Sequence, residues 1–125
     1  MKISQAEFEV LLALWDCEEP TRPAKLLQRM EATHPWSIST LKTLLTRLQD
    51  KGAVQVICQK RFHYCTPAYT KEEFFALQTK RLMRSLNASP ASLLGGLISD
   101  GELTEEELDG LEQMLAAAKS REVSK

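Results

Sequence analysis

Residues 35–53 read PWSISTLKTLLTRLQDKGA and predict one helix with two unlike faces. Four leucines recur at the spacing of a 3.6-residue period and therefore share an apolar face: Leu41, Leu44, Leu45 and Leu48. The opposite face carries Thr40, Thr43 and Arg47, at positions i, i+3 and i+7. A helix that buries leucines and exposes hydroxyls and a guanidinium has the side chains needed to lie in the major groove of DNA.

Short-range signals define both ends of this helix. Ser37 or Ser39 can cap its N-terminus, because a serine hydroxyl accepts a hydrogen bond from a free backbone amide. Gly52 closes the C-terminus, since glycine readily adopts the left-handed conformation that ends a helix. Trp36 precedes the cap and is expected to pack against the helix entry.

Two further helices are expected before this one. A capping box of Ser4 and Glu7 begins the first, with each side chain bonded to the other residue's amide. Thr21 is expected to cap the second, with Pro23 in the first turn, where proline's missing amide is harmless. Only a few residues separate the second helix from the leucine-rich one, so the pair is expected to form a helix-turn-helix.

After Gly52 the sequence changes from helical to strand periodicity. Residues 53–58 read AVQVIC and residues 61–66 read RFHYCT, and both are rich in β-branched or aromatic side chains. Gln59 and Lys60 between them are polar and fit a two-residue turn. We therefore expect an antiparallel hairpin, in a sequence that lacks the Asn-Gly pair typical of such turns.

Three amphipathic helices are expected to follow. Capping boxes or a serine-proline start mark their beginnings at residues 70, 89 and 104. Apolar stripes in such short helices more often pack against a second copy of the chain, the alternative being that they fold back on the N-terminal part. We expect eight side chains to form a dimer contact: Phe74, Phe75, Leu82, Leu86, Leu97, Leu108, Leu111 and Leu115.

The order of these elements predicts a mostly α fold with a minor β component. Residues 1–69 are expected to form a winged helix-turn-helix domain that binds DNA, and residues 70–125 a helical dimerisation arm. The chain has no apolar run long enough to span a membrane and no signal-peptide core at its start, so we expect a cytoplasmic protein without a membrane partner. Its three widely spaced cysteines are typical of reduced thiols.

The net charge of −1 hides an uneven distribution. Residues 20–69 hold eight basic and two acidic side chains, whereas residues 1–19 and 70–125 are acidic on balance. A basic segment is what a binder of phosphate backbones shows locally, although surface lysines also cluster by chance.

The expected DNA contacts divide into two sets. Thr40, Thr43 and Arg47 are expected to reach base edges, because arginine fits the two acceptors of guanine and threonine fits the thymine methyl. Six others are expected to contact the phosphate backbone: Ser37, Ser39, Lys42, Lys51, Lys60 and Arg61. Taken alone, such a face is more often merely solvated, but the order of elements and the basic segment favour DNA.

Several segments also resemble a known family. ISQAEFEVLLALW (residues 3–15), WSISTLKTLLTRLQDKGAV (36–54) and YCTP (64–67) resemble the penicillinase-repressor family, which includes the BlaI, MecI and copper-responsive CopY repressors. The resemblance continues weakly through LTEEELDGLEQML (103–115). It implies a winged-helix transcriptional repressor that binds a palindromic operator in double-stranded DNA as a homodimer, using its C-terminal helices to dimerise.

The chain departs from the inducible members of that family. In the penicillin-responsive members a sensor protease cuts an Asn-Phe bond in the fifth helix, and Gly96–Leu97 occupies that place here. The copper-responsive members carry C-terminal Cys-x-Cys motifs, and no cysteine follows Cys65 here. The wing has Lys60 where the family usually has glycine. The resemblance therefore implies neither mechanism of induction, and a sensor or protease partner stays unknown.

Other chemistries find little support in the sequence. Cys58, His63 and Cys65 are close enough in sequence for a metal or thiol sensor to be considered. A turn at Gln59–Lys60 would place Cys58 near Arg61 and Cys65 near Val54, too far apart for a disulfide.

No phosphate loop, nucleophile motif or Cys-x-x-Cys pair occurs, so we expect no enzymatic activity, no metal and no cofactor. The alternative to a DNA-binding regulator is a winged-helix module for protein-protein interaction without sequence-specific DNA binding.

Overall fold

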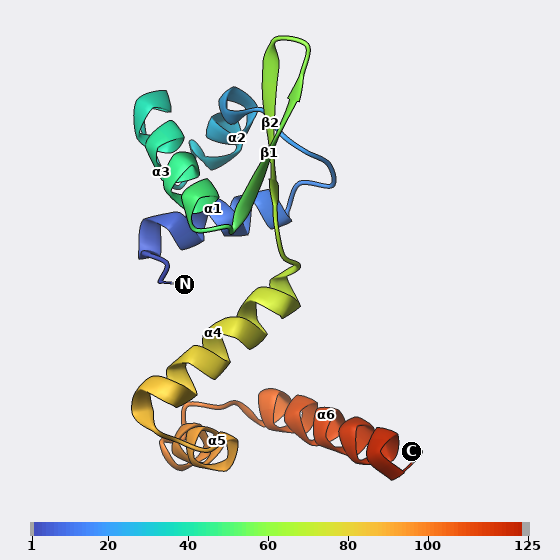
Figure 1. The fold of residues 1–125 in the computed structure, drawn as a ribbon. Helices are drawn as coiled ribbons and strands as arrows, with labels where there is room; N and C mark the ends of the chain where they lie inside the picture. Colours follow the sequence, from blue (N-terminus) through green and yellow to red (C-terminus); the bar gives the residue numbers. More distant parts are fainter. Residues whose placement is uncertain (1, 124–125) are drawn as a thin grey trace. The chain divides into compact units, whose positions relative to one another are not determined.

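The structure, a computed structural model, describes residues 2–123 and has the expected elements in the expected order (Figure 1). The helices are α1 (Gln5–Trp15), α2 (Pro23–Met30), α3 (Ile38–Asp50), α4 (Lys71–Leu86), α5 (Pro90–Ser99) and α6 (Glu105–Val123). The strands β1 (Val54–Gln59) and β2 (Phe62–Pro67) pair antiparallel and form the wing. The mostly α fold with a minor β component is confirmed.

Residue contacts divide the chain into two compact units, Met1–Thr79 and Lys80–Lys125. The division falls inside α4, later than the boundary expected after residue 69. The start of α4 belongs to the first unit because Phe74 is only 3% exposed and its ring centroid lies 5.3 Å from that of Trp15 in α1. Burial of this ring anchors the helix that leads into the second unit.

The core of the first unit is built on the leucine face of α3. Leu41, Leu44, Leu45 and Leu48 are all buried, as their spacing predicts. They pack with apolar side chains of α1 and α2, namely Val10, Leu11, Leu14, Leu26 and Met30. Because one face of α3 is buried along its whole length, the opposite face must point to solvent.

Both ends of α3 are closed by specific backbone geometry. The Ser37 hydroxyl accepts a hydrogen bond from the Thr40 amide at 3.1 Å, so Ser37 rather than Ser39 is the cap. At the other end Gly52 has a φ of +79°, and the Ala53 amide reaches back to the Leu48 carbonyl at 2.9 Å. This glycine-dependent closure turns the chain directly from α3 into β1.

The wing turns one residue later than the sequence predicts. Gln59 pairs with Phe62, so the loop is Lys60–Arg61 and not Gln59–Lys60. Cys58 therefore lies opposite His63, and Cys65 opposite Val56, which corrects the expected register. In the observed loop Lys60 adopts a φ of +59°, a conformation for which turn-sequence rules favour glycine or asparagine.

Thr21 does not cap α2 as expected. The cap position is held by Arg22, which makes no side-chain capping bond, and Pro23 occupies the first turn. Thr21 instead exchanges two backbone hydrogen bonds with Cys65, at 2.9 and 2.8 Å. The linker before α2 thus pairs with the wing, which ties β2 to the helix-turn-helix.

The second unit has clear helix starts and an open apolar surface. Ser89 caps α5, and Thr104 and Glu107 form the expected capping box of α6. No residue of α5 is buried, and many of its large apolar side chains and those of α6 are exposed. No helix in the described part of the chain is both long and apolar enough to cross a membrane.

A buried ion pair joins the start of α1 to the end of α3. Glu7 is 2% exposed, and its two carboxylate oxygens accept hydrogen bonds from the Lys51 ammonium at 2.7 and 2.8 Å. The Ser4 amide donates to the same carboxylate at 3.1 Å. The capping box was expected from the sequence, but its closure by a lysine 44 residues away was not.

This geometry lowers the pKa of Glu7. Burial by itself raises the pKa, but the hydrogen bonds from Lys51 and Ser4 and the attraction of the ammonium outweigh it. A carboxylate whose pKa is lowered on folding stabilises the fold above its unfolded pKa of about 4.3. That stability is lost as the pH falls through the lower, folded value.

We expect Lys51→Met to lower the free energy of unfolding at pH 7 by about 1–3 kcal/mol, because it leaves a buried carboxylate without its cation. The loss is smaller than for a fully buried pair, since the Lys51 side chain is 33% exposed. Urea denaturation at pH values from 7 to 3 should show the gap to the natural protein closing as Glu7 protonates. Lys25→Met, at an exposed lysine of α2, should leave stability nearly unchanged. A gap that stayed constant down to pH 3 would contradict this role for the pair.

Lys60→Gly should raise the free energy of unfolding by about 0.5–1 kcal/mol, because it relieves the left-handed conformation of a residue with a Cβ. Arg61→Gly is the matched control at the other loop position, which has no positive φ, and it should lower stability slightly. Thermal denaturation measures both. Equal effects of the two substitutions would show that the turn geometry is wrong.

Candidate nucleic-acid interface

The solvent face of α3 carries the three side chains expected to contact bases. Thr40, Thr43 and Arg47 are all exposed and lie on the side of the helix opposite its buried leucines. The Thr43 hydroxyl donates to the Ser39 carbonyl at 3.0 Å. Its proton is therefore used inside the helix, and what it offers outward is an acceptor oxygen and a methyl group.

Arg47 differs from these threonines because its guanidinium is not held by the fold. Within the described part of the chain it takes part in no ion pair and no side-chain hydrogen bond. Five donors of fixed geometry thus stand free on the outer face of a rigid helix. A bidentate contact to an acceptor pair, such as guanine O6 and N7, suits this group well.

The start of α3 presents hydroxyls and free amides. Ser37 is committed as the cap, and its hydroxyl also lies 3.1 Å from that of Thr40. Ser39 is exposed in the first turn, beside amides that have no partner within the helix. Such a helix start carries partial positive charge and can receive a phosphate.

The basic side chains expected at the phosphate backbone have different surroundings. Lys42, Lys60 and Arg61 are exposed. Lys51 is engaged with Glu7, so a phosphate would have to compete with a buried carboxylate for its ammonium. The sequence gives no signal for that pairing, because the two residues are far apart in the chain.

Arg22 is a basic residue that the sequence analysis left out of the site. It lies exposed at the start of α2, and its guanidinium carbon is 3.7 Å from the centroid of the Phe62 ring in the wing. Cation–π packing of this kind fixes the side chain beside the wing. Its place in a basic segment was visible in the sequence, but its contact with Phe62 depends on the corrected register of the hairpin.

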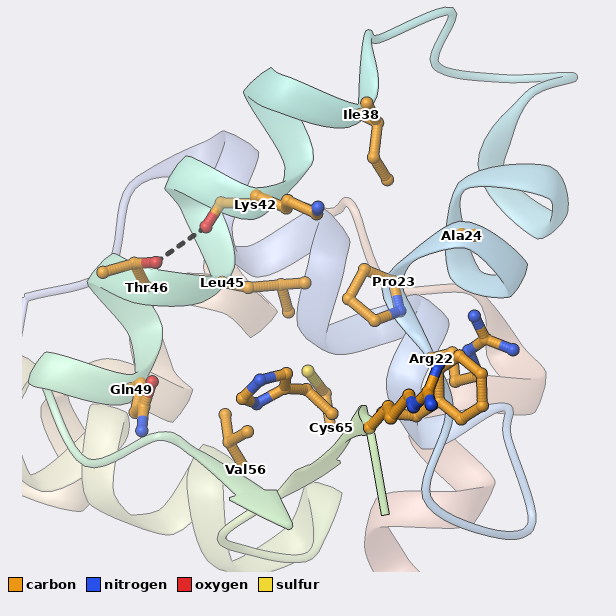
Figure 2. Close-up of a pocket in the computed structure, with 13 residues that line it drawn as sticks. Arg22, Pro23, Ala24, Ile38, Lys42, Leu45, Thr46, Gln49, Val56 and Cys65 are labelled. Atoms are coloured by element: carbon orange, nitrogen blue, oxygen red, sulfur yellow. Dashed lines mark hydrogen bonds between the residues drawn. The ribbon is translucent and has the colours of Figure 1, made fainter. Parts of the chain in front are cut away.

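A hollow of about 450 Å³ separates α3 from the wing (Figure 2). Its lining comes from the start of α2, one side of α3 and both strands of the wing. Lys42 and Arg61, both expected at the phosphate backbone, are part of this lining. The basic side chains of the helix-turn-helix and of the wing thus meet around one concave surface.

The wing thiols occupy unlike environments. Cys58 is exposed and its sulfur lies 3.3 Å from His63 Nδ1, whereas Cys65 is buried. Burial raises the pKa of the Cys65 thiol, which keeps it protonated. Within residues 2–123, no group of three or more His, Cys, Asp or Glu side chains gathers in a metal-binding arrangement.

The structure separates the eight side chains expected at a dimer contact. Phe74 belongs to the core of the first unit, so it has no surface left for a second copy, which corrects its assignment. Phe75 is exposed, although its ring stacks on that of Phe8 with centroids 6.2 Å apart. Leu111 is half-buried. The other five are exposed: Leu82, Leu86, Leu97, Leu108 and Leu115.

Comparison with known proteins agrees with this arrangement. A model of the penicillinase repressor family matches residues 3–117. The penicillinase repressor of Bacillus licheniformis is 26% identical over 121 residues, which cover 96% of this chain and 94% of that protein.

Solved structures point the same way. The DNA-binding domain of the repressor BlaI is 29% identical, with a TM-score of 0.51 over 58% of this chain and 87% of that one. The Bacillus licheniformis BlaI monomer in complex with the blaP half-operator is also 29% identical, with a TM-score of 0.50 over 58% of this chain and 88% of that one. A MarR family protein from Bacillus stearothermophilus, 19% identical with a TM-score of 0.51 over 100% of this chain and 78% of that one, shares the fold. The chain belongs to the penicillinase repressor family of transcriptional regulators.

Proposed function

We propose that this chain represses transcription by binding a palindromic operator in double-stranded DNA as a homodimer. The observation that carries the proposal is the outer face of α3, where Thr40, Thr43 and Arg47 stand exposed on a helix held rigidly by its leucines. The 29% identical BlaI structure contains a half-operator, which supports DNA as the ligand. Each α3 would enter a major groove, and the bound dimer would block the promoter.

Base reading is assigned to the three residues of the outer face. Arg47 would donate to guanine O6 and N7 in bidentate fashion. Thr43, whose hydroxyl proton is held by Ser39, would accept from an adenine or cytosine amino group or place its methyl against thymine. Thr40, one turn nearer the helix start, would contact a neighbouring base pair.

Phosphate contacts would fix the position of α3 in the groove. Ser37, Ser39 and Lys42 are candidates on the helix, and Lys60 and Arg61 at the tip of the wing. Lys51 would contribute chiefly by holding α3 to α1 through Glu7. Because phosphate contacts release counterions, affinity should fall steeply as the salt concentration rises.

Dimerisation is assigned to the second unit. Exposed leucines on α5 and α6 leave an apolar surface that a second copy would cover. Gly96–Leu97, at the place of the family's protease-sensitive bond, lies within α5 and differs from the Asn-Phe pair. The signal that releases the repressor is therefore expected to differ from cleavage at that bond.

The second candidate function is a winged-helix adaptor that binds another protein. The exposed apolar side chains of the second unit favour a protein contact of some kind. A gel-shift assay at low salt, with duplexes selected from a random library, separates the two functions. No shifted complex at micromolar protein would favour the adaptor.

Arg47→Ala should reduce the ratio of operator to random-sequence affinity by about 10–100-fold, because a bidentate base contact is worth about 1–3 kcal/mol of discrimination. Fluorescence anisotropy at one fixed salt concentration measures both affinities. Arg29→Ala, at an exposed arginine of α2, is the matched control and should leave the ratio unchanged. An unchanged ratio in Arg47→Ala would show that this face does not read the sequence.

Leu115→Asp should convert the dimer to a monomer, because it places a charge on an apolar side chain that is 54% exposed in the single chain. Sedimentation velocity should show the loss of mass, and the full operator should then bind no better than a half-site. Gln113→Asp, on the opposite face of α6, should remain dimeric. Dimeric Leu115→Asp would place the interface elsewhere.

A further inference from the structure

The hollow between α3 and the wing, called here the wing groove, has the size of a small-molecule site. Its volume is about 450 Å³, within the range of pockets that hold small ligands. In Figure 2, Lys42 and Leu45 of α3 point toward Pro23 at the start of α2, and Arg22, Val56 and Cys65 complete the lining.

The floor of the wing groove is apolar. Leu45 and Cys65 are buried members of the core, and Val56 packs against it half-buried. Ile38 and Phe62 extend this surface outward and are largely exposed. The core of the first unit therefore reaches the surface at the bottom of a recess, where an aromatic ring could displace water from it.

The rim of the wing groove carries charge of one sign. Arg22, Lys42 and Arg61 line it, and no carboxylate of residues 2–123 does. The neighbouring hollow, between the α1–α2 linker and α2, differs because Asp16, Glu18 and Glu19 line it together with basic residues. Arg22 lines both hollows, whereas Lys42 and Arg61 line the wing groove alone, and their positive charge favours an anionic ligand there.

Arg22 is held ready for such a ligand. Its guanidinium lies against the Phe62 ring at 3.7 Å, and this packing restricts its motion beside the groove. A guanidinium already fixed in place loses little entropy when it donates to a carboxylate through two parallel hydrogen bonds. Arg22 thus combines an orienting ring contact with guanidinium donors that form no ion pair within the described part of the chain.

We propose that the wing groove binds a small aromatic carboxylate, with the ring on the Leu45–Val56 floor and the carboxylate at the cationic rim to which Arg22, Lys42 and Arg61 contribute. A DNA phosphate shares the anionic chemistry but has no group for the apolar floor. Lys42 and Arg61 are also assigned to DNA phosphates, so the ligand and the operator would compete for them. This regulatory consequence rests on the proposed function, whereas the ligand site does not.

The test is calorimetry on the DNA-free full chain with 2-naphthoate as the probe. Naphthoate should bind with a Kd below about 1 mM, an affinity within the range that a ligand with so few non-hydrogen atoms can reach. Inorganic phosphate, which offers charge alone, and 2-naphthylmethanol, which offers the ring alone, should each bind at least tenfold more weakly. If phosphate bound as tightly as naphthoate, the groove would be a nucleic-acid backbone contact, and if the alcohol did, it would be an apolar patch. Either result overturns the proposal. Absence of naphthoate binding overturns it as well.

Variants locate the site. Arg22→Met and Lys42→Met should each weaken naphthoate binding at least fivefold. Both side chains are exposed, so the substitutions should leave the fold intact, and circular dichroism checks this. Arg29→Met, in the neighbouring hollow, should bind naphthoate as the natural chain does. Methyl NMR shifts on titration should be largest at Leu45 and Val56; shifts confined to the second unit would overturn the site.

Competition is measured separately. Saturating naphthoate should lower operator affinity at least tenfold in the natural chain and leave Lys42→Met less affected. Naphthoate binding with unchanged operator affinity would overturn the regulatory half of the proposal. A chain that binds naphthoate but no DNA would refute the repressor function and leave the ligand site standing.

Discussion

Burial of the leucine face of α3 is the constraint on which the rest of the structure depends. Leu41, Leu44, Leu45 and Leu48 cannot turn outward without exposing the centre of the core to water. Their burial fixes the rotation of the helix about its own axis, and thereby decides which side chains face solvent. Burial of the leucines therefore determines which residues are exposed on the opposite side, because the 3.6-residue period of an α-helix fixes the angle between any two side chains.

Two further contacts fix the position of α3 relative to α1 and the wing, in addition to its rotation about its own axis. The Glu7–Lys51 ion pair joins its C-terminal end to α1, and the closure at Gly52 sends the chain straight into the wing. Backbone bonds between Thr21 and Cys65 then return the wing to the linker before α2. The helix α3, the wing and α1 are thus linked to one another, which preorganises the basic surface before any ligand arrives.

Local signals in the sequence predicted every helix, although Arg22 and not Thr21 holds the cap position of α2. The leucine spacing, the capping box of Ser4 and Glu7, and the serine-proline start of α5 each depend on residues within one or two turns of one another, and the structure has all of them. The predicted wing register was wrong, and in the observed loop Lys60 adopts a left-handed conformation that lysine does not favour. The observed loop lies one residue later than predicted, which changes every cross-strand pair.

Long-range contacts explain what the sequence could not reveal about the site. The pairing of Lys51 with Glu7, the packing of Arg22 on Phe62 and the burial of Phe74 against Trp15 each join distant segments. The helical periodicity placed Phe74 on the apolar face of its helix. It did not indicate whether Phe74 would be buried in its own unit or against a second copy of the chain. The exposed face of α3 was predictable because it follows from a single helix, and its role in reading DNA stays a prediction.

The most direct measurement exchanges each guanine of a selected operator half-site for 7-deazaguanine, which lacks the N7 acceptor, and determines affinity for the natural chain and for Arg47→Ala. If Arg47 reads a guanine, one exchange per half-site weakens the natural chain by about tenfold and has no further effect on the variant. Equal losses in both proteins at every guanine would contradict the assignment of α3 as the reading helix through Arg47.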